Sequence, residues 1–243
     1  MESISIVEKY HAIARRTAAA AVSAHRDPAE ITIIVVTKGQ PAEKMLPLLE
    51  LGVRDFGENY PEETEQKLTA FDPTVGIRWH MIGHLQSRKS AIIARYFSMY
   101  HSVDRLDIME KIQRHLEQEE KVLPVMAEVN ISGEATKGGF EATERSDWAL
   151  VAQQLKTITS YPRIQLTGLM CMPPLAQNPE DNLPYFAAAR ELRDYLRDEH
   201  GLAGLVNLSM GTREDFEAAV REGATHIRIG QAILGPRPFK EKL

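Results

Sequence analysis

Short runs of β-branched and other apolar residues alternate with longer amphipathic segments along most of the chain. Eight such runs predict β-strands, and the segments between them have the apolar spacing of helices. An amphipathic segment at about 3–25 predicts an additional N-terminal helix. The predicted strands are 31–37, 53–57, 77–82, 98–103, 123–129, 163–169, 205–208 and 225–229, and the predicted helices are 41–51, 60–70, 86–95, 104–119, 143–158, 182–199 and 212–222.

Several predicted helices begin or end at residues that favour helix termini. Pro41 and Pro61 suit first-turn positions, whereas Gly52 and Gly223 suit helix C-termini. The segment 212–215 predicts a capping box with an aspartate in place of the usual glutamate. This regular alternation of strands and helices predicts βα units around a parallel sheet.

Eight strand–helix steps in 243 residues fit a (β/α)8 barrel, or TIM barrel, better than an open sheet. No linker or low-complexity stretch divides the chain, so we expect residues 1–243 to form a single domain of this α/β class. In such barrels ligands bind at the carboxyl ends of the strands, and phosphate commonly binds after strands 7 and 8. Closure also places the last strand beside the first, about 4.8 Å away.

The composition is that of an ordinary globular protein, with 43% hydrophobic and 26% charged residues. A net charge of −5 argues against broad binding to nucleic acid or anionic membranes, so any anion site must be local. The single cysteine, Cys171, leaves no intrachain disulfide and no cysteine cluster for a metal. Charged residues interrupt the N-terminal segment, and the apolar runs are too short to span a membrane. We therefore expect a cytoplasmic monomer.

Lys38 is the lone cation at the end of the first predicted strand. A lysine forms a Schiff base with an aldehyde when its amine can lose a proton, which partial burial favours. Alternation puts Lys38 on the same face as Ile34 and Val36, and this face is the predicted barrel interior. The alternative is a lysine that extends from the strand end into solvent.

Two glycine-containing turns, 209–211 and 228–231, follow the last two predicted strands. Small residues let backbone N–H groups approach phosphate oxygens, and Ser209 adds a hydroxyl. Either turn alone would be weak evidence, but two turns after consecutive strands predict a phosphate site. A lone amine opposite a phosphate site suits an aldehyde that carries a phosphate, and pyridoxal 5'-phosphate (PLP) is the obvious candidate.

Arg228 shares a strand face with His226 and Gly230, so its side chain is predicted to point into the barrel. There it either donates to the pyridine nitrogen of PLP or pairs with an acid such as Glu58. In the first case the nitrogen stays unprotonated, because arginine is effectively always charged. The ring is then a weaker electron sink.

Other polar residues follow the predicted strands at the same end of the barrel. His80 and His84 have metal-like spacing, but they span a strand and a loop, so we expect no metal and interpret them as pocket or core histidines. Asn59 would either hydrogen-bond a cofactor hydroxyl or cap the next helix. Lys137 lies in a glycine-containing segment after the fifth strand, and its role stays open.

The sequence resembles the pyridoxal phosphate homeostasis protein family, whose fold is similar to the barrel domain of alanine racemase. The resemblance spans nearly the whole chain and implies a fold-type III PLP-binding barrel. It rests on several motifs in matching order, at 36–38 with Pro41, and at 56–60, 79–87, 168–170, 208–211 and 220–230.

The resemblance also implies roles for individual residues. Lys38 would form the Schiff base, Arg228 would face the pyridine nitrogen, and Asn59 and His80 would lie near the ring. The family often has threonine or serine where Gln231 stands, so a hydroxyl contact is missing at that position. The implied phosphate site consists of Ser209, Gly211, Gly230 and Gln231.

The resemblance implies a PLP-binding protein that acts in intracellular PLP homeostasis with little or no catalytic turnover, and PLP-dependent apoenzymes are candidate partners. The first alternative is a fold-type III amino-acid racemase or related PLP enzyme with Lys38 as its base. A racemase of that kind needs a second base positioned by another domain, and about a dozen residues after the eighth strand leave no room for one. The second alternative is a Schiff-base aldolase whose turns hold a sugar phosphate.

Overall fold

A computed structural model describes residues 4–238 of the chain. It contains all eight predicted strands and one further strand, β6 (Phe140–Glu141), that was not predicted. Two residues are too few to show a hydrophobic alternation. The barrel strands are β1 (Thr32–Val36), β2 (Asp55–Glu58), β3 (Arg78–Met81), β4 (Met99–Val103), β5 (Leu123–Asn130), β7 (Ile164–Met170), β8 (Asn207–Thr212) and β9 (His226–Ile229).

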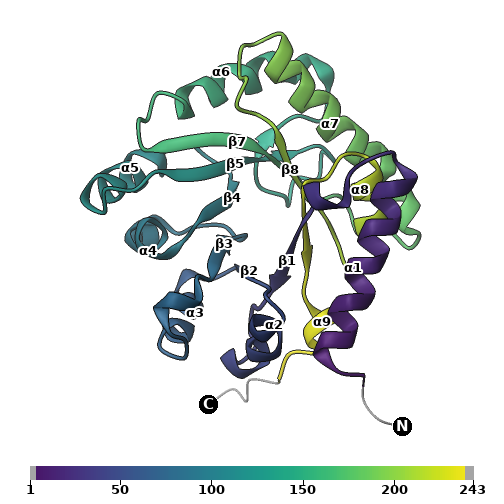
Figure 1. Cartoon of the computed structure of the whole chain (residues 1–243). Helices are drawn as coiled ribbons and strands as arrows, with labels where there is room; N and C mark the ends of the chain where they lie inside the picture. The colour runs from purple at the N-terminus through teal and green to yellow at the C-terminus, as the bar shows by residue number, and fades with distance from the viewer. Residues whose placement is uncertain (1–3, 239–243) are drawn as a thin grey trace.

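The strands form a closed parallel barrel with helices around it (Figure 1). Their order is β4-β3-β2-β1-β9-β8-β7-β5, and the β4–β5 pairing closes the ring. Strand β6 is an addition beside β5. The first and last strands are neighbours, with Ile34 paired to Arg228 and Val35 to Ile229. The predicted (β/α)8 barrel is therefore confirmed.

All the predicted helices are present but shorter than predicted, and for 41–51, 86–95 and 143–158 the reason is that the first turn is 3-10 helix. The 3-10 segments Ala42–Met45, Ser87–Lys89, Arg145–Asp147 and Pro179–Asn182 lead directly into α-helices. The helix α9 was not predicted. The α-helices are α1 (Ile6–Ser23), α2 (Leu46–Glu50), α3 (Pro61–Leu68), α4 (Ser90–Tyr96), α5 (Met109–Gln118), α6 (Trp148–Ile158), α7 (Leu183–Asp198), α8 (Phe216–Arg221) and α9 (Gln231–Leu234).

The extra N-terminal helix α1 lies on the outside of the barrel, alongside α8 and α9 (Figure 1). A capping box fixes its start, because Ser5 Oγ accepts a hydrogen bond from Glu8 N and Glu8 accepts one from Ser5 N. Arg16 pairs with Glu217 of α8 at 2.9 Å. The helix therefore covers the side of the barrel where the first and last strands meet.

The predicted capping box at 212–215 forms only in part. The Asp215 carboxylate accepts a hydrogen bond from Thr212 N at 2.6 Å. However, α8 begins at Phe216, so that Asp215 rather than Thr212 is its N-cap residue, and no side chain caps the helix. Strand β8 continues to Thr212, four residues beyond the predicted end, because it keeps pairing with Arg228 of β9.

The strands pack apolar side chains outward against the helices, whereas polar side chains occupy much of the barrel interior. In β9, Ile227 and Ile229 are fully buried with the helices, and His226 and Arg228 alternate with them on the inner side. Barrels of this type are usually filled by branched apolar residues. Here His101 and Ser209 are also fully buried inside, so that the interior is unusually polar.

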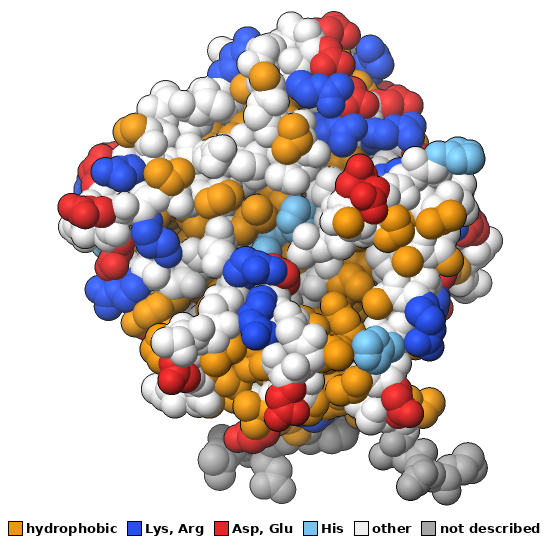
Figure 2. Space-filling model, in the orientation of Figure 1, with side chains coloured by type: hydrophobic (Ala, Val, Ile, Leu, Met, Phe, Trp, Pro, Cys, Tyr) orange, Lys and Arg blue, Asp and Glu red, His pale blue; other side chains and the backbone are white. Residues whose placement is uncertain are grey.

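No helix within residues 4–238 is long and apolar enough to cross a membrane. On the face shown in Figure 2, basic and acidic side chains are interspersed with hydrophobic ones. The net charge of −5 is therefore not gathered into a single negative patch on this face.

Candidate functional site

A cavity of about 300 Å³ lies at the carboxyl ends of β1 and β9. It brings together five of the residues that the sequence singled out, although they come from opposite ends of the chain. The pairing of β1 with β9 explains this convergence. The cavity is lined by Val36, Lys38, Asn59, Ile82, Met172, Leu175, Thr212, Arg213, Arg228, Gly230, Gln231 and Arg237.

Lys38 follows β1 by two residues and is partly buried at the cavity wall. Its Nζ lies 5.0 Å from the centroid of the Tyr60 ring, a cation–π contact. Within residues 4–238 its amine has no hydrogen bond or ion pair with another side chain. The prediction that Lys38 faces the interior end of the barrel is confirmed, and its amine is available to a ligand.

Buried polar contacts fix the backbone on both sides of Lys38. Thr37 Oγ1 donates to Glu58 Oε1 at 2.5 Å, and Lys67 Nζ donates to the Thr37 carbonyl at 2.8 Å. On the other side, Gly39 N donates to Glu63 Oε2 at 2.7 Å. These contacts come from β2 and α3, so that the neighbouring βα unit positions Lys38.

Glu58 and Lys67 form a buried ion pair beneath this segment. Burial raises the pKa of Glu58 to about 7, although the nearby Lys67 ammonium and the Thr37 hydroxyl act in the opposite direction. One of the two alternatives for Arg228, a pairing with Glu58, is therefore wrong, because Glu58 already has Lys67 as its partner. The ion pair instead helps to hold the backbone next to Lys38, because both of its members contact Thr37.

Arg228 lies at the floor of the cavity, and only 4% of its surface is exposed. Its Nη1 donates to Ser209 Oγ at 2.6 Å, and its Nη2 donates to the Cys171 carbonyl at 3.1 Å. Nη2 also contacts Met172 Sδ at 2.9 Å, which is a weak acceptor. Burial lowers the pKa of Arg228 from its ordinary value, but no carboxylate in residues 4–238 pairs with it directly.

Three predicted site residues do not line the cavity. Gly211 lies just before Thr212 and has φ +89°, which favours glycine. A Cβ atom there would lie 2.6 Å from Ala219 Cβ, so that glycine also lets β8 pack closely on α8. Ser209 and His80 are buried below the cavity, where the Ser209 hydroxyl bonds Arg228 and His101. Asn59 lines the cavity and does not cap α3, whose N-cap residue is Tyr60.

Sequence reasoning missed two arginines at the cavity rim. Arg213 follows β8 in the left-handed region with φ +37°. The Arg237 side chain crosses Gly39, where a Cβ atom would lie 3.3 Å from Arg237 Cδ. Neither arginine has a carboxylate partner in the part of the chain that the structure describes. The position of Arg213 next to a predicted phosphate turn was a usable signal, whereas Arg237 lies beyond the last predicted strand.

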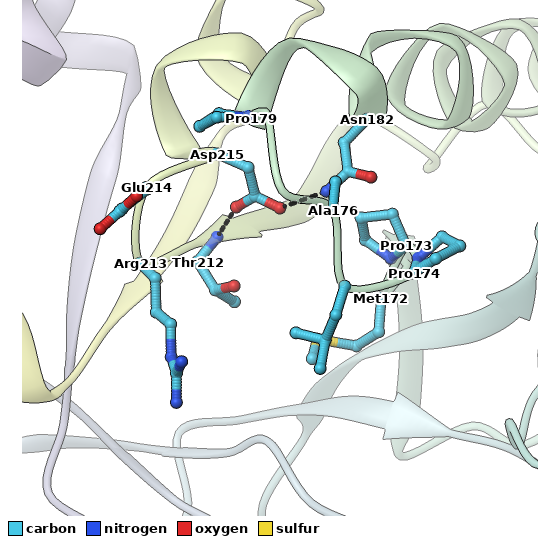
Figure 3. Close-up of a pocket in the computed structure, with 11 residues that line it drawn as sticks. Met172, Pro173, Pro174, Ala176, Pro179, Asn182, Thr212, Arg213, Glu214 and Asp215 are labelled. Atoms are coloured by element: carbon cyan, nitrogen blue, oxygen red, sulfur yellow. Dashed lines mark hydrogen bonds between the residues drawn. The ribbon is translucent and has the colours of Figure 1, made fainter.

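A second cavity, of about 230 Å³, adjoins the first and shares Met172, Leu175, Thr212 and Arg213 with it. Figure 3 shows that it lies between the segment after β7 and the loop after β8. Asp215 links the two, accepting from Thr212 N at 2.6 Å and from Asn182 Nδ2 at 2.9 Å. The same loops therefore shape both cavities.

The two histidines with metal-like spacing have different partners. His80 is buried and contacts Asp55 and His101, whereas His84 is half exposed and contacts Glu128 Oε2 at 2.9 Å. The hydrogen bond to Glu128 raises the pKa of His84. Residues 4–238 contain no group of three or more potential metal ligands. Lys137 donates to the Met172 carbonyl at 2.6 Å and pairs with Glu134 at 2.8 Å.

The protein is a closed barrel in which a lysine and an arginine face one cavity at the carboxyl rim. Its class is that of the family model described as alanine racemase, N-terminal domain, which matches residues 10–238. Among solved structures, PipY of Synechococcus elongatus PCC7942 with PLP bound has a TM-score of 0.78 and 28% identity over 92% of this chain and all of that one. An alanine racemase of Clostridium difficile, at 14% identity and a TM-score of 0.64, shares the fold.

Sequence relatives make the assignment more specific. A protein of Pseudomonas aeruginosa is 38% identical over 97% of both chains, and one of Aquifex aeolicus is 36% identical over 85% of this chain and 87% of its own. One of Escherichia coli K12 is 35% identical over 93% of this chain and 94% of its own. All three are named pyridoxal phosphate homeostasis protein. The chain belongs to this family, as the resemblance predicted.

Proposed function

We propose that this protein binds PLP through Lys38 and serves intracellular PLP homeostasis with little or no turnover of its own. The observation that carries the proposal is the convergence on one cavity of an amine that is unpaired within residues 4–238, a buried guanidinium and a glycine-containing turn. The PLP-bound PipY structure and the names of the relatives support it.

The residues present fit PLP. The cavity volume of about 300 Å³ is at the lower end of the range for small-molecule sites. Backbone N–H groups at Gly230 and Gln231 would hold the phosphate, Gly211 would set the course of the turn beside it, and Arg213 and Arg237 would add positive charge near it. The Ser209 hydroxyl is committed to Arg228 in this structure, so its contribution to the site would pass through that arginine.

At the other end of the ligand, Arg228 would donate to the pyridine nitrogen and Asn59 to the ring hydroxyl. A pyridine nitrogen is a stronger acceptor than the Met172 thioether that Arg228 now contacts. The permanent charge of Arg228 would keep that nitrogen unprotonated.

Bound PLP supplies an aldehyde that condenses with an amine to give a Schiff base with loss of water. Lys38 is placed to supply that amine, because it lines the cavity and its backbone is fixed on both sides. Tyr60 covers the amine from one side. The side chain is only partly buried, so that exchange of the ligand with solvent or with a recipient protein has a path.

The lining of the cavity favours a carrier over an enzyme. Among the described residues, the side chains that line it include no carboxylate, imidazole or thiol, and Tyr60, whose ring covers the Lys38 amine, is not part of the lining. Racemisation needs bases on both faces of the substrate carbon. We therefore propose a monomeric cytoplasmic carrier that holds PLP reversibly and passes it to PLP-dependent apoenzymes.

The test is a titration of the purified protein with PLP, followed by absorbance. We expect an imine band that is absent from Lys38→Ala and unchanged in Lys156→Ala, since Lys156 is exposed on α6. An imine band in Lys38→Ala equal to that of the wild type would refute the proposal. The carrier role is tested separately by assaying the protein in parallel against a panel of amino acids. Racemisation at enzyme-like rates would contradict the carrier role but not the binding of PLP through Lys38.

A further inference from the structure

A line of buried polar side chains crosses the barrel interior beneath the cavity. It begins at Arg228, whose Nη1 lies 2.6 Å from Ser209 Oγ. Ser209 Oγ lies 2.9 Å from His101 Nδ1, and His101 Nε2 lies 2.9 Å from His80 Nδ1. The line ends where His80 Nε2 meets Asp55 Oδ1 at 3.0 Å. Five strands, β9, β8, β4, β3 and β2, each contribute one residue.

In one direction of the line each hydrogen has an acceptor, whereas in the other the Ser209 hydrogen would have none within the line. Arginine can only donate, so Ser209 Oγ accepts from Arg228 and its own hydrogen has His101 Nδ1 as acceptor. A neutral His101 then carries its hydrogen on Nε2 and donates to His80 Nδ1. His80 in turn donates from Nε2 to the Asp55 carboxylate. Every donor in the line thus has one acceptor.

The surroundings of His101 agree with a neutral imidazole at the centre of the line. Burial is the main cause that lowers the pKa of His101 far below its ordinary value, and the nearby Arg228 charge acts in the same direction. Burial favours protonation of Asp55, but hydrogen bonds from His80 and Arg78 outweigh it and hold the pKa of Asp55 below its ordinary value. His226 lies outside the line, with its ring centroid 5.4 Å from that of His101 and its Nδ1 bonded to Thr225.

We propose that Ser209, His101, His80 and Asp55 are positioning residues that hold the Arg228 guanidinium at the cavity floor for contact with the PLP ring. This inference rests on the proposed function. The line ends on the Asp55 carboxylate, which is also ion-paired with Arg78, so that only hydrogen bonds through the line connect Arg228 to a carboxylate. Arg228 is therefore held in one orientation without a neighbouring carboxylate that would neutralise it. Aligned hydrogen bonds of this kind strengthen one another.

The first test compares two substitutions of His101. Glutamine retains an acceptor and a donor on one planar group, whereas leucine has neither. We expect PLP to bind about tenfold more weakly to His101→Leu, since the loss of a buried hydrogen bond reaches about this size. We expect His101→Gln to remain within about threefold of the wild type, and both variants to keep the imine band on Lys38. Equal affinities for leucine and wild type, or equal losses for leucine and glutamine, would overturn the proposal.

The second test needs neither PLP nor a variant. Nitrogen-15 NMR of the histidines in the ligand-free protein at neutral pH reports which ring nitrogen carries the hydrogen. We expect His101 to be neutral with its hydrogen on Nε2, and His80 to carry a hydrogen on the Nε2 that faces Asp55. A hydrogen on His101 Nδ1 would contradict the direction of the line even if His101→Leu does not fold. If wild-type protein forms no imine, the proposed function fails instead, and the NMR result still decides the direction of the line.

Discussion

The charged side chains at the rim of the barrel differ from those in its interior in whether they have partners. At the rim, Lys38, Arg213 and Arg237 face the cavity without a carboxylate partner in residues 4–238. In the interior, Arg228 and Asp55 terminate a continuous line of hydrogen bonds, and Glu58 is paired with Lys67. Unpaired cations are available to an anionic ligand, whereas bonded ones fix the geometry of others. The difference separates the residues that would touch the ligand from those that would position them.

The buried ion pair provides the largest expected change in stability. Lys67→Met removes the partner of Glu58, so that the buried carboxyl must either stay charged without a partner or take up a proton, and breaking a buried pair in this way typically costs about 3–5 kcal/mol of unfolding free energy. The matched control is Lys89→Met, because Lys89 pairs with Glu62 near the surface and such pairs contribute about 1 kcal/mol or less. Denaturant unfolding measures both. Equal costs for the two variants would show that the interior pair is no more important than the surface pair.

The next largest effect concerns the interior histidines, which are expected to lower the free energy of unfolding at acidic pH. Burial lowers the pKa of His226 from 6.5 to about 3, with a smaller contribution from His80. Below pH 6.5 the unfolded chain binds a proton that the folded chain does not, so stability is lost as the pH falls from 6.5 towards 3. The loss is about 1.4 kcal/mol per pH unit for each such histidine. We expect unfolding of His226→Gln to depend less steeply on pH in this range, and a slope equal to that of wild type would contradict the assignment.

The rim arginines provide the smallest effect, since both are exposed. We expect Arg213→Ala and Arg237→Ala each to weaken PLP binding roughly two- to fivefold, as solvent-exposed charge contacts do. Added salt is expected to reduce the difference from wild type. Pyridoxal without its phosphate is the control ligand, because neither substitution is expected to change its binding. A loss of equal size for pyridoxal would mean that these arginines do not contact the phosphate.

Much of this site could be predicted from the sequence, because strand alternation is encoded locally and eight strand–helix steps predict a closed ring. The apolar run before Lys38 and the glycine turn at Gly230 placed the two on neighbouring strands, and β1 does pair with β9. The orientation of a side chain is a different matter. The Ser209 hydroxyl turns towards His101, which is 108 residues away, and no local pattern reveals that partner.

The rim arginines could not be predicted for another reason. Arg213 and Arg237 lie in loops, where hydrophobic periodicity gives no information about direction. Strand β6 was missed because two residues show no alternation, and the first turns of several helices are 3-10, which shifted the predicted boundaries. That Arg228 does not pair with Glu58 could be seen only from the position of Lys67, which lies on α3 and is the partner of Glu58.

The central claim is that Lys38 is the amine that holds PLP, and one measurement tests it most directly. The protein is mixed with PLP, reduced with borohydride and digested, and the masses of its peptides are measured by mass spectrometry. We predict a single pyridoxyl group on the peptide that contains Lys38. An unmodified chain, or label spread over other lysines such as Lys137 with Lys38 unmodified, would contradict the claim.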